Sequence, residues 1–122
     1  MLNNVKIMVV EDDPLIRDLI VTVLTYCVNR EVLSFDRSEL AWEYIQKGGE
    51  IDMIISKSNM PDMNGFELMN RVREQHLDKI FIIASEIFSD EERSLKAGAD
   101  AFLAKPFEIN DLFSIVQCFV VD

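Results

Sequence analysis

The sequence predicts an α/β protein built on a doubly wound parallel sheet, with five strands flanked by five helices. Two observations favour this class. Five short apolar runs alternate along the chain with five segments whose apolar residues recur every three or four positions. No internal repeat or low-complexity linker interrupts the alternation. Strict alternation of strand and helix is typical of a parallel sheet with right-handed crossovers, and 122 residues suit one core. We therefore expect residues 1–122 to form a single domain.

The first strand is predicted over residues 5–10, VKIMVV, and the first helix follows it at once. Pro14 suits the first position of a helix, and Asp13 before it is available to cap the free backbone amides. Apolar residues from Ile16 to Cys27 then fall on one helical face. This pattern predicts a helix from Pro14 to Cys27.

The second strand is predicted over 32–35, and Ser38 is the residue we expect to cap the next helix. Gly48-Gly49 should end that helix. The third strand is predicted over 53–56 and leads into a polar loop, 57–65. The third helix begins at the end of this loop.

The second half of the chain continues the pattern. Residues 80–84, IFIIA, read as a central strand because nearly every residue is apolar. Ser89 and Glu92 have the spacing of a capping box, which predicts the start of the fourth helix. The fifth strand is predicted over 101–104, and the last helix carries its apolar stripe from Ile109 to Val120.

Composition excludes several classes of protein. There are 22 acidic and 12 basic residues, a net charge of −10, so we expect no binding to nucleic acid, which needs a basic face. No apolar run approaches the roughly 20 residues that span a bilayer, and the N-terminus lacks the layout of a signal peptide. We expect a cytoplasmic protein with no membrane association.

Polar side chains follow the predicted strands where a parallel sheet of this class binds ligands, at the carboxyl ends of its strands. Asp12 and Asp13 follow the first strand, Lys57 the third, Ser85 the fourth and Lys105 the fifth. Two adjacent carboxylates suit a hard divalent cation such as Mg²⁺. The alternative for this pair is helix capping on a solvated acidic turn.

The order and spacing of these motifs resemble the receiver domains of two-component signalling, especially the stand-alone chemotaxis response regulators, over essentially the whole chain. The matching segments are VVEDDP at 9–14, NMPDMNGFEL at 59–68, Ser85, and GADAFLAKPF at 98–107. The resemblance implies a flavodoxin-like fold with strand order 2-1-3-4-5 and a role in phosphorelay signal transduction.

Carried onto this sequence, the resemblance assigns Asp12, Asp13 and the backbone carbonyl of Asn59 to a Mg²⁺ site. It assigns Ser85 and Lys105 to contacts with a phosphoryl group, and Phe102 to the aromatic switch. It also implies a cis peptide before Pro106. A sensor histidine kinase, a downstream protein or a second copy of the chain would bind the face formed by the fourth helix, the fifth strand and the fifth helix.

The resemblance fails at the decisive position. In the family, the aspartate that accepts the phosphoryl group lies four residues before the loop proline, here Pro61, and this position is Lys57. An ammonium group cannot form the aspartyl phosphate. We expect Lys57 to pair with Asp12 or Asp13 and to weaken or displace Mg²⁺, so that the chain binds this cofactor of the family weakly or not at all. Glu86 is a second departure, because a small residue is usual there; it would pair with Lys57 or Lys105, or point into solvent.

Three hypotheses for function follow. The first is an atypical receiver that acts as an interaction module without phosphorylation. The second is a conventional Mg²⁺-dependent receiver that natural divergence or design has altered at Lys57 and locked in one state. The third, an enzyme on the same fold, is disfavoured because the chain lacks a glycine-rich phosphate loop and a nucleophile elbow. We therefore expect no enzymatic activity.

Overall fold

A computed structural model describes residues 5–27, 29–75 and 78–120. Its five strands form one parallel sheet in the order β2-β1-β3-β4-β5, which confirms the predicted fold class. The strands are β1 (Lys6–Val10), β2 (Glu31–Phe35), β3 (Met53–Lys57), β4 (Ile80–Ser85) and β5 (Ala101–Ala104). Each lies within one or two residues of its predicted run.

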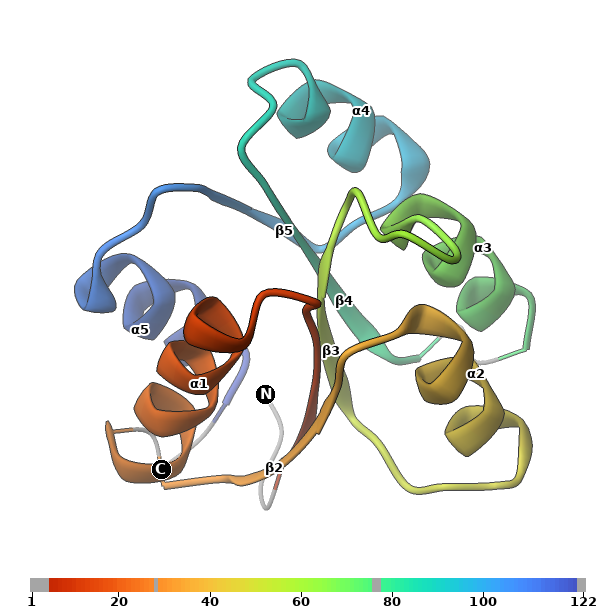
Figure 1. Ribbon diagram of the computed structural model, residues 1–122, viewed down its shortest axis with the longest axis horizontal. Helices are drawn as coiled ribbons and strands as arrows, with labels where there is room; N and C mark the ends of the chain where they lie inside the picture. The colour runs from red at the N-terminus through yellow and green to blue at the C-terminus, as the bar shows by residue number, and fades with distance from the viewer. Residues whose placement is uncertain (1–4, 28, 76–77, 121–122) are drawn as a thin grey trace.

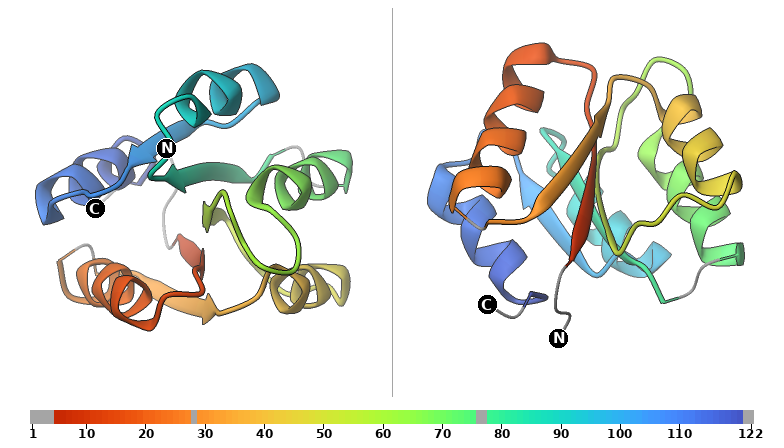
Figure 2. Two further views of the ribbon diagram at one scale, coloured as in Figure 1. Left: turned by 45° about the horizontal axis from the view of Figure 1, so that its top comes forward. Right: turned by 90° about the horizontal axis from the view of Figure 1, so that it is seen from below.

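Helices cover both faces of the sheet, as Figure 1 shows. They are α1 (Pro14–Thr22), α2 (Ser38–Gln46), α3 (Gly65–Gln75), α4 (Asp90–Ala97) and α5 (Ile109–Gln117), and a π-helical turn, η1 (Val23–Cys27), continues α1. Helices α1 and α5 lie on one side of the strands, with α2 and α3 on the other (Figures 1 and 2). Within the described residues, no helix has the length and apolar character needed to cross a membrane.

Alternation along the strands explains why the sheet is buried on both faces. In β1, Ile7 and Val9 belong to the cluster under α1 and α5, whereas Met8 and Val10 belong to the cluster under α2 and α3. Successive side chains of a strand point to opposite faces, so a central parallel strand must be apolar throughout. The two clusters cover both faces of the sheet, and the charged side chains lie at the carboxyl ends of its strands.

Two predicted helix caps are wrong. The side chain of Ser38 makes no cap; instead the carboxylate of Asp62, in the loop after β3, accepts from the backbone N–H groups of Ser38 (3.2 Å) and Glu39 (2.8 Å). Ser89 stands at the start of α4 without a side-chain cap. At the start of the last helix, the carboxylate of Asp111 accepts from the backbone N–H of Glu108 at 2.9 Å.

Candidate functional site

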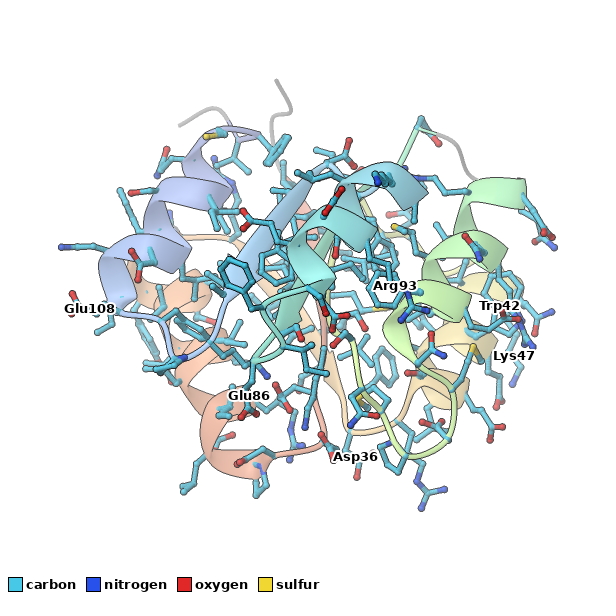
Figure 3. The ribbon with its side chains drawn as sticks, turned by 90° about the horizontal axis from the view of Figure 1, so that it is seen from above. Asp36, Trp42, Lys47, Glu86, Arg93 and Glu108 are labelled. Carbon is cyan, nitrogen blue, oxygen red and sulfur yellow. The ribbon has the colours of Figure 1, made fainter. Side chains whose placement is uncertain are left out.

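The carboxyl ends of β1, β3 and β5 bring four charged side chains together. Glu11 and Asp12 follow β1, Lys57 is the last residue of β3, and Lys105 follows β5. β1 pairs directly with β3, which aligns their ends. Glu86 directly follows β4 and Asp36 directly follows β2, so both mark the carboxyl ends of their strands. Figure 3 shows both residues in the lower part of the view, which is where this edge of the sheet lies.

Lys57 makes the central contact of the site. Its Nζ donates a hydrogen bond to Asp12 Oδ1 at 2.9 Å and lies 3.7 Å from Glu11 Oε2. The side chain is 21% exposed, so the ammonium group is largely withdrawn from water. Lys57 is thus a half-buried cation held by two carboxylates, as the sequence predicted for Asp12.

Lys105 and Glu11 form the buried part of the site. Lys105 Nζ donates a hydrogen bond to Glu11 Oε1, and both side chains are almost completely inaccessible, 3% and 2% exposed. Glu11 Oε2 also accepts from the backbone N–H of Asp13 at 3.1 Å. Both oxygens of Glu11 are therefore occupied, as a buried carboxylate requires. The peptide bond between Lys105 and Pro106 is cis, as expected.

Asp13 does not belong to this cluster, which corrects the predicted pair of carboxylates. Its Oδ1 accepts from the backbone N–H groups of Leu15 (2.9 Å) and Ile16 (3.4 Å), so Asp13 caps α1. Glu11 takes its place beside Asp12. The sequence held a signal for this shift: Pro14 at the first helical position leaves the preceding residue as the cap. We missed Glu11 because it reads as the first residue of an acidic turn.

The four charges sum to zero, and each cation is paired. Burial alone would raise the pKa of Asp12, but its hydrogen bond and charge interaction with Lys57 outweigh burial and leave this pKa below its ordinary value. Burial alone would lower the pKa of Lys57, yet Asp12, Glu11 and the charge of Glu86 outweigh it and raise this pKa. Both groups are therefore held in their charged forms.

Asn59 and Glu86 lie near Lys57 but outside its ion pairs. Asn59 is exposed and lines a hollow with Lys57, Ser85 and Glu86. Glu86 is exposed and, in the part of the chain that the structure describes, forms no ion pair within 4.0 Å. The solvent alternative for Glu86 therefore fits its placement.

The side chains of Ser85 and Phe102 contact other residues than the two lysines of the site. The Ser85 hydroxyl donates to Asp90 Oδ2 at 2.7 Å, and the Phe102 ring is half-buried against the cluster under α2 and α3. The backbone carbonyl of Ser85 accepts from the backbone N–H of Lys105 at 2.9 Å, but among the described residues neither side chain makes a hydrogen bond or ring contact with the side chain of Lys57 or Lys105.

The loop after β3 is fitted tightly against Lys57. The backbone N–H of Gly65 donates to the carbonyl of Ser58 at 2.7 Å. A Cβ atom at position 65 would lie 2.5 Å from the Lys57 carbonyl oxygen, closer than real contacts allow. Glycine is therefore required here by the close approach of the two backbones, and the loop fixes the backbone that carries Lys57.

The donor set does not fit a divalent cation. Glu11 and Asp12 are the carboxylates of the site, and lysine ammonium groups already take three of the contacts that their oxygens offer. Among the described residues, no group of three or more acidic, histidine or cysteine side chains is arranged to hold a metal ion. We therefore assign no step to a metal.

A doubly wound sheet in the order 2-1-3-4-5 is the flavodoxin-like architecture, which binds its ligands at the carboxyl ends of the strands, where the charged cluster lies. Residues 7–117 match the family model described as "Response regulator receiver domain". The chain belongs to the response-regulator receiver family, whose members act in two-component signalling with histidine kinases and downstream proteins.

Similar proteins agree with this assignment. The chain is 32% identical to a chemotaxis protein CheY homolog of Campylobacter jejuni. The 106 aligned residues cover 84% of this chain and 82% of that protein. It is also 32% identical to chemotaxis protein CheY1 of Helicobacter pylori, with 84% and 86% covered. The structure of the chemotaxis response regulator CheY4 of Vibrio cholerae superposes with a TM-score of 0.85 at 28% identity, covering 93% of this chain and 97% of that one.

Proposed function

We propose that this protein is a receiver domain that signals without aspartyl phosphorylation, as a protein-interaction module, and that Lys57 stands where receivers carry the phosphoacceptor aspartate. The observation that carries the proposal is the Lys57 ion pair. Its ammonium group lies within 4 Å of both Glu11 and Asp12, on the last residue of β3. A carboxylate nucleophile is needed to form an acyl phosphate, and a protonated amine cannot replace it.

The charges of the site support the same conclusion. Receiver domains generally bind Mg²⁺. With an aspartate at position 57, the side chains of residues 11, 12, 57 and 105 would sum to −2, which favours a divalent cation. With Lys57 they sum to zero, because the ammonium group adds the two units that Mg²⁺ would contribute. We infer that Lys57 replaces the cation, and that the protein works in the cytoplasm with no metal cofactor and no reaction of its own.

The face for a partner is proposed to be the one formed by α4, β5 and α5. Apolar side chains are exposed on or next to this face, namely Ile87, Phe88, Leu95 and Ile109. Exposed large apolar residues that lie close together are typical of protein interfaces. A histidine kinase, a downstream protein or a second copy of the chain would bind here.

Mass spectrometry after treatment with a small-molecule phosphodonor and Mg²⁺ tests the proposal. We expect no phosphoryl adduct on the wild-type chain, even at high donor concentration. The variant Lys57→Asp should gain one acid-labile phosphoryl group if the remaining pocket is competent, as expected for a conventional receiver altered at this residue. The charge-matched control is Lys47→Asp, which makes the same change at an exposed lysine of a distant helix end and should gain none.

Each outcome has a distinct meaning. An aspartyl adduct on the wild-type chain would refute the proposal. An adduct on Lys57→Asp alone would favour the alternative hypothesis, a Mg²⁺-dependent receiver locked in one state by Lys57. Failure of all three proteins would favour a pocket that has diverged further from phosphotransfer, because restoring the carboxylate would then not restore the chemistry.

A further inference from the structure

The segment between β4 and α4 is held by a buried hydrogen bond to a charged group. Ser85 ends β4 and Asp90 begins α4, and the Ser85 hydroxyl donates to Asp90 Oδ2 at 2.7 Å. Both residues are buried, with 4% and 6% of their surface exposed. Hydrogen bonds to an ionised acceptor in a buried setting are among the stronger ones in proteins.

The hydrogen bond to Asp90 uses the only hydrogen that the Ser85 hydroxyl can donate. A hydroxyl has one hydrogen to donate, and that hydrogen goes to Asp90. The Ser85 oxygen in turn accepts from the backbone N–H of Ile87 at 3.0 Å. The Ser85 hydroxyl therefore serves the loop, and to donate to a group beside Lys57 it would have to break its bond to Asp90.

Asp90 is also tied into its own helix. The buried hydroxyl of Ser94 donates to the Asp90 carbonyl at 2.5 Å. The next two acidic residues of the first turn, Glu91 and Glu92, are exposed. They interact with the helix dipole as Asp90 does, so the dipole gives no reason for Asp90 to be buried. The hydrogen bond from Ser85 does.

The loop that is fixed in this way presents two apolar side chains. Ile87 is half exposed, and Phe88 is 93% exposed. Figure 3 shows this loop between Glu86 and the helix that carries Arg93, in front of the sheet. We propose that Asp90 is a positioning residue which, by holding the Ser85 hydroxyl, fixes Ile87 and Phe88 in their exposed positions independently of the Lys57 site.

Native-state hydrogen exchange, followed by NMR on the full chain, tests the proposal at the Ile87 amide. Asp90→Ala should speed exchange at Ile87 by about tenfold, as expected when a hydrogen bond to a charged group is lost. Asp90→Asn keeps an acceptor oxygen and should change it by less than about threefold. Glu91→Ala, which removes an exposed charge from the same turn, should leave Ile87 unchanged. Lys57→Met lowers the stability of the whole fold, so it should not accelerate exchange at Ile87 more than at the reference amide of Ser58.

The amide of Ser58 serves as the internal reference, because it donates to the carbonyl of Ala84 in the neighbouring strand. Equal acceleration at Ile87 and Ser58 would mean global destabilisation and would overturn the proposal. An unchanged rate at Ile87 in folded Asp90→Ala would overturn it as well. Acceleration at Ile87 in Lys57→Met relative to Ser58 would refute the claimed independence of the Lys57 site.

Chymotrypsin gives a second readout, since it cleaves after exposed phenylalanine. Cleavage after Phe88 should rise by about tenfold in Ser85→Ala, which removes the donor and keeps the Asp90 charge. This variant also decides the question if Asp90→Ala does not fold, and unchanged cleavage would overturn the proposal. The use of this loop for a partner rests on the proposed function, whereas the role of Asp90 does not. Phosphorylation of the wild-type chain would refute the proposed function without affecting the exchange and cleavage results expected here.

Discussion

Lys57 Nζ lies 2.9 Å from Asp12 Oδ1, across the junction between the ends of two adjacent strands. The pair joins a residue of β3 to the turn after β1, 45 positions away in the sequence. Glu11 and Lys105 form a second, fully buried pair beside it, so that the site is electrically balanced within itself. A balanced site is stable without a ligand, and the predictions below concern this balance and the helix cap next to it.

Replacement of Lys57 by methionine should destabilise the fold. The variant keeps the length of the side chain but removes the hydrogen bond to Asp12, and it removes one of the two lysines that the described residues place against Glu11 and Asp12. Because Lys57 is partly exposed, we expect a loss of about 1–2 kcal/mol in the free energy of unfolding, measured with urea. The matched control is Lys47→Met. Lys47 pairs with Glu43 at 2.6 Å but is exposed, so this change should cost less than about 0.5 kcal/mol. Equal effects of the two variants would contradict the assignment.

The contribution of Lys57 should depend on pH at both ends of the scale. The pKa of Asp12 is lowered in the folded state, so this carboxylate stabilises the protein above its ordinary pKa of 3.8 and loses that contribution as pH falls through the lowered value. The pKa of Lys57 is raised, so its contribution is complete below the ordinary value of 10.5 and is lost as pH rises through the raised one. The difference in unfolding free energy between wild type and Lys57→Met should therefore be flat from about pH 5 to 9. It should shrink below pH 3.8 and above pH 10.5. A difference that changes mainly near pH 6 to 8 would point to another titrating group.

Two residues that meet at the start of α2, Asp62 and Ser38, should differ in their effect on the free energy of unfolding when each is replaced by alanine. Asp62 accepts from the backbone N–H groups of Ser38 and Glu39, so Asp62→Ala should cost about 1 kcal/mol in the free energy of unfolding. Among the residues that the structure describes, the buried Ser38 hydroxyl has no hydrogen-bond partner. Its removal in Ser38→Ala should be neutral or slightly stabilising. Thermal or urea unfolding of both variants checks this, and a larger loss in Ser38→Ala than in Asp62→Ala would restore Ser38 as the cap.

The sequence predicted the fold well because its signals are local. Each strand is an apolar run and each helix has its own periodicity, so neither depends on knowing what lies next to it. The site was predicted less well. Three acidic residues follow β1, and composition does not say which two face the lysines; Asp13 is used by the helix, whereas Glu11 is turned inward.

Contacts between distant segments were the hardest to foresee. The Asp62 cap joins residues 24 positions apart, and no local pattern at Ser38 announces it. The capping box expected at Ser89 does not form; the backbone of Ser89 is already in the helical region, with φ −68° and ψ −14°, whereas a capping residue is extended. At Ser38, a tertiary contact takes the role that the local sequence had assigned to a serine.

The most direct test of the central claim, that Lys57 supplies the positive charge of a metal ion, is a Mg²⁺ titration followed by NMR at the amides of Glu11, Asp12 and Asn59. Three proteins are compared: wild type, Lys57→Asp, and the charge-matched Lys47→Asp. We predict saturable shifts at these amides in Lys57→Asp alone, with affinity about tenfold or more above the other two, since the substitution removes two units of positive charge at the site. Binding to wild type as tight as to Lys57→Asp would contradict the claim.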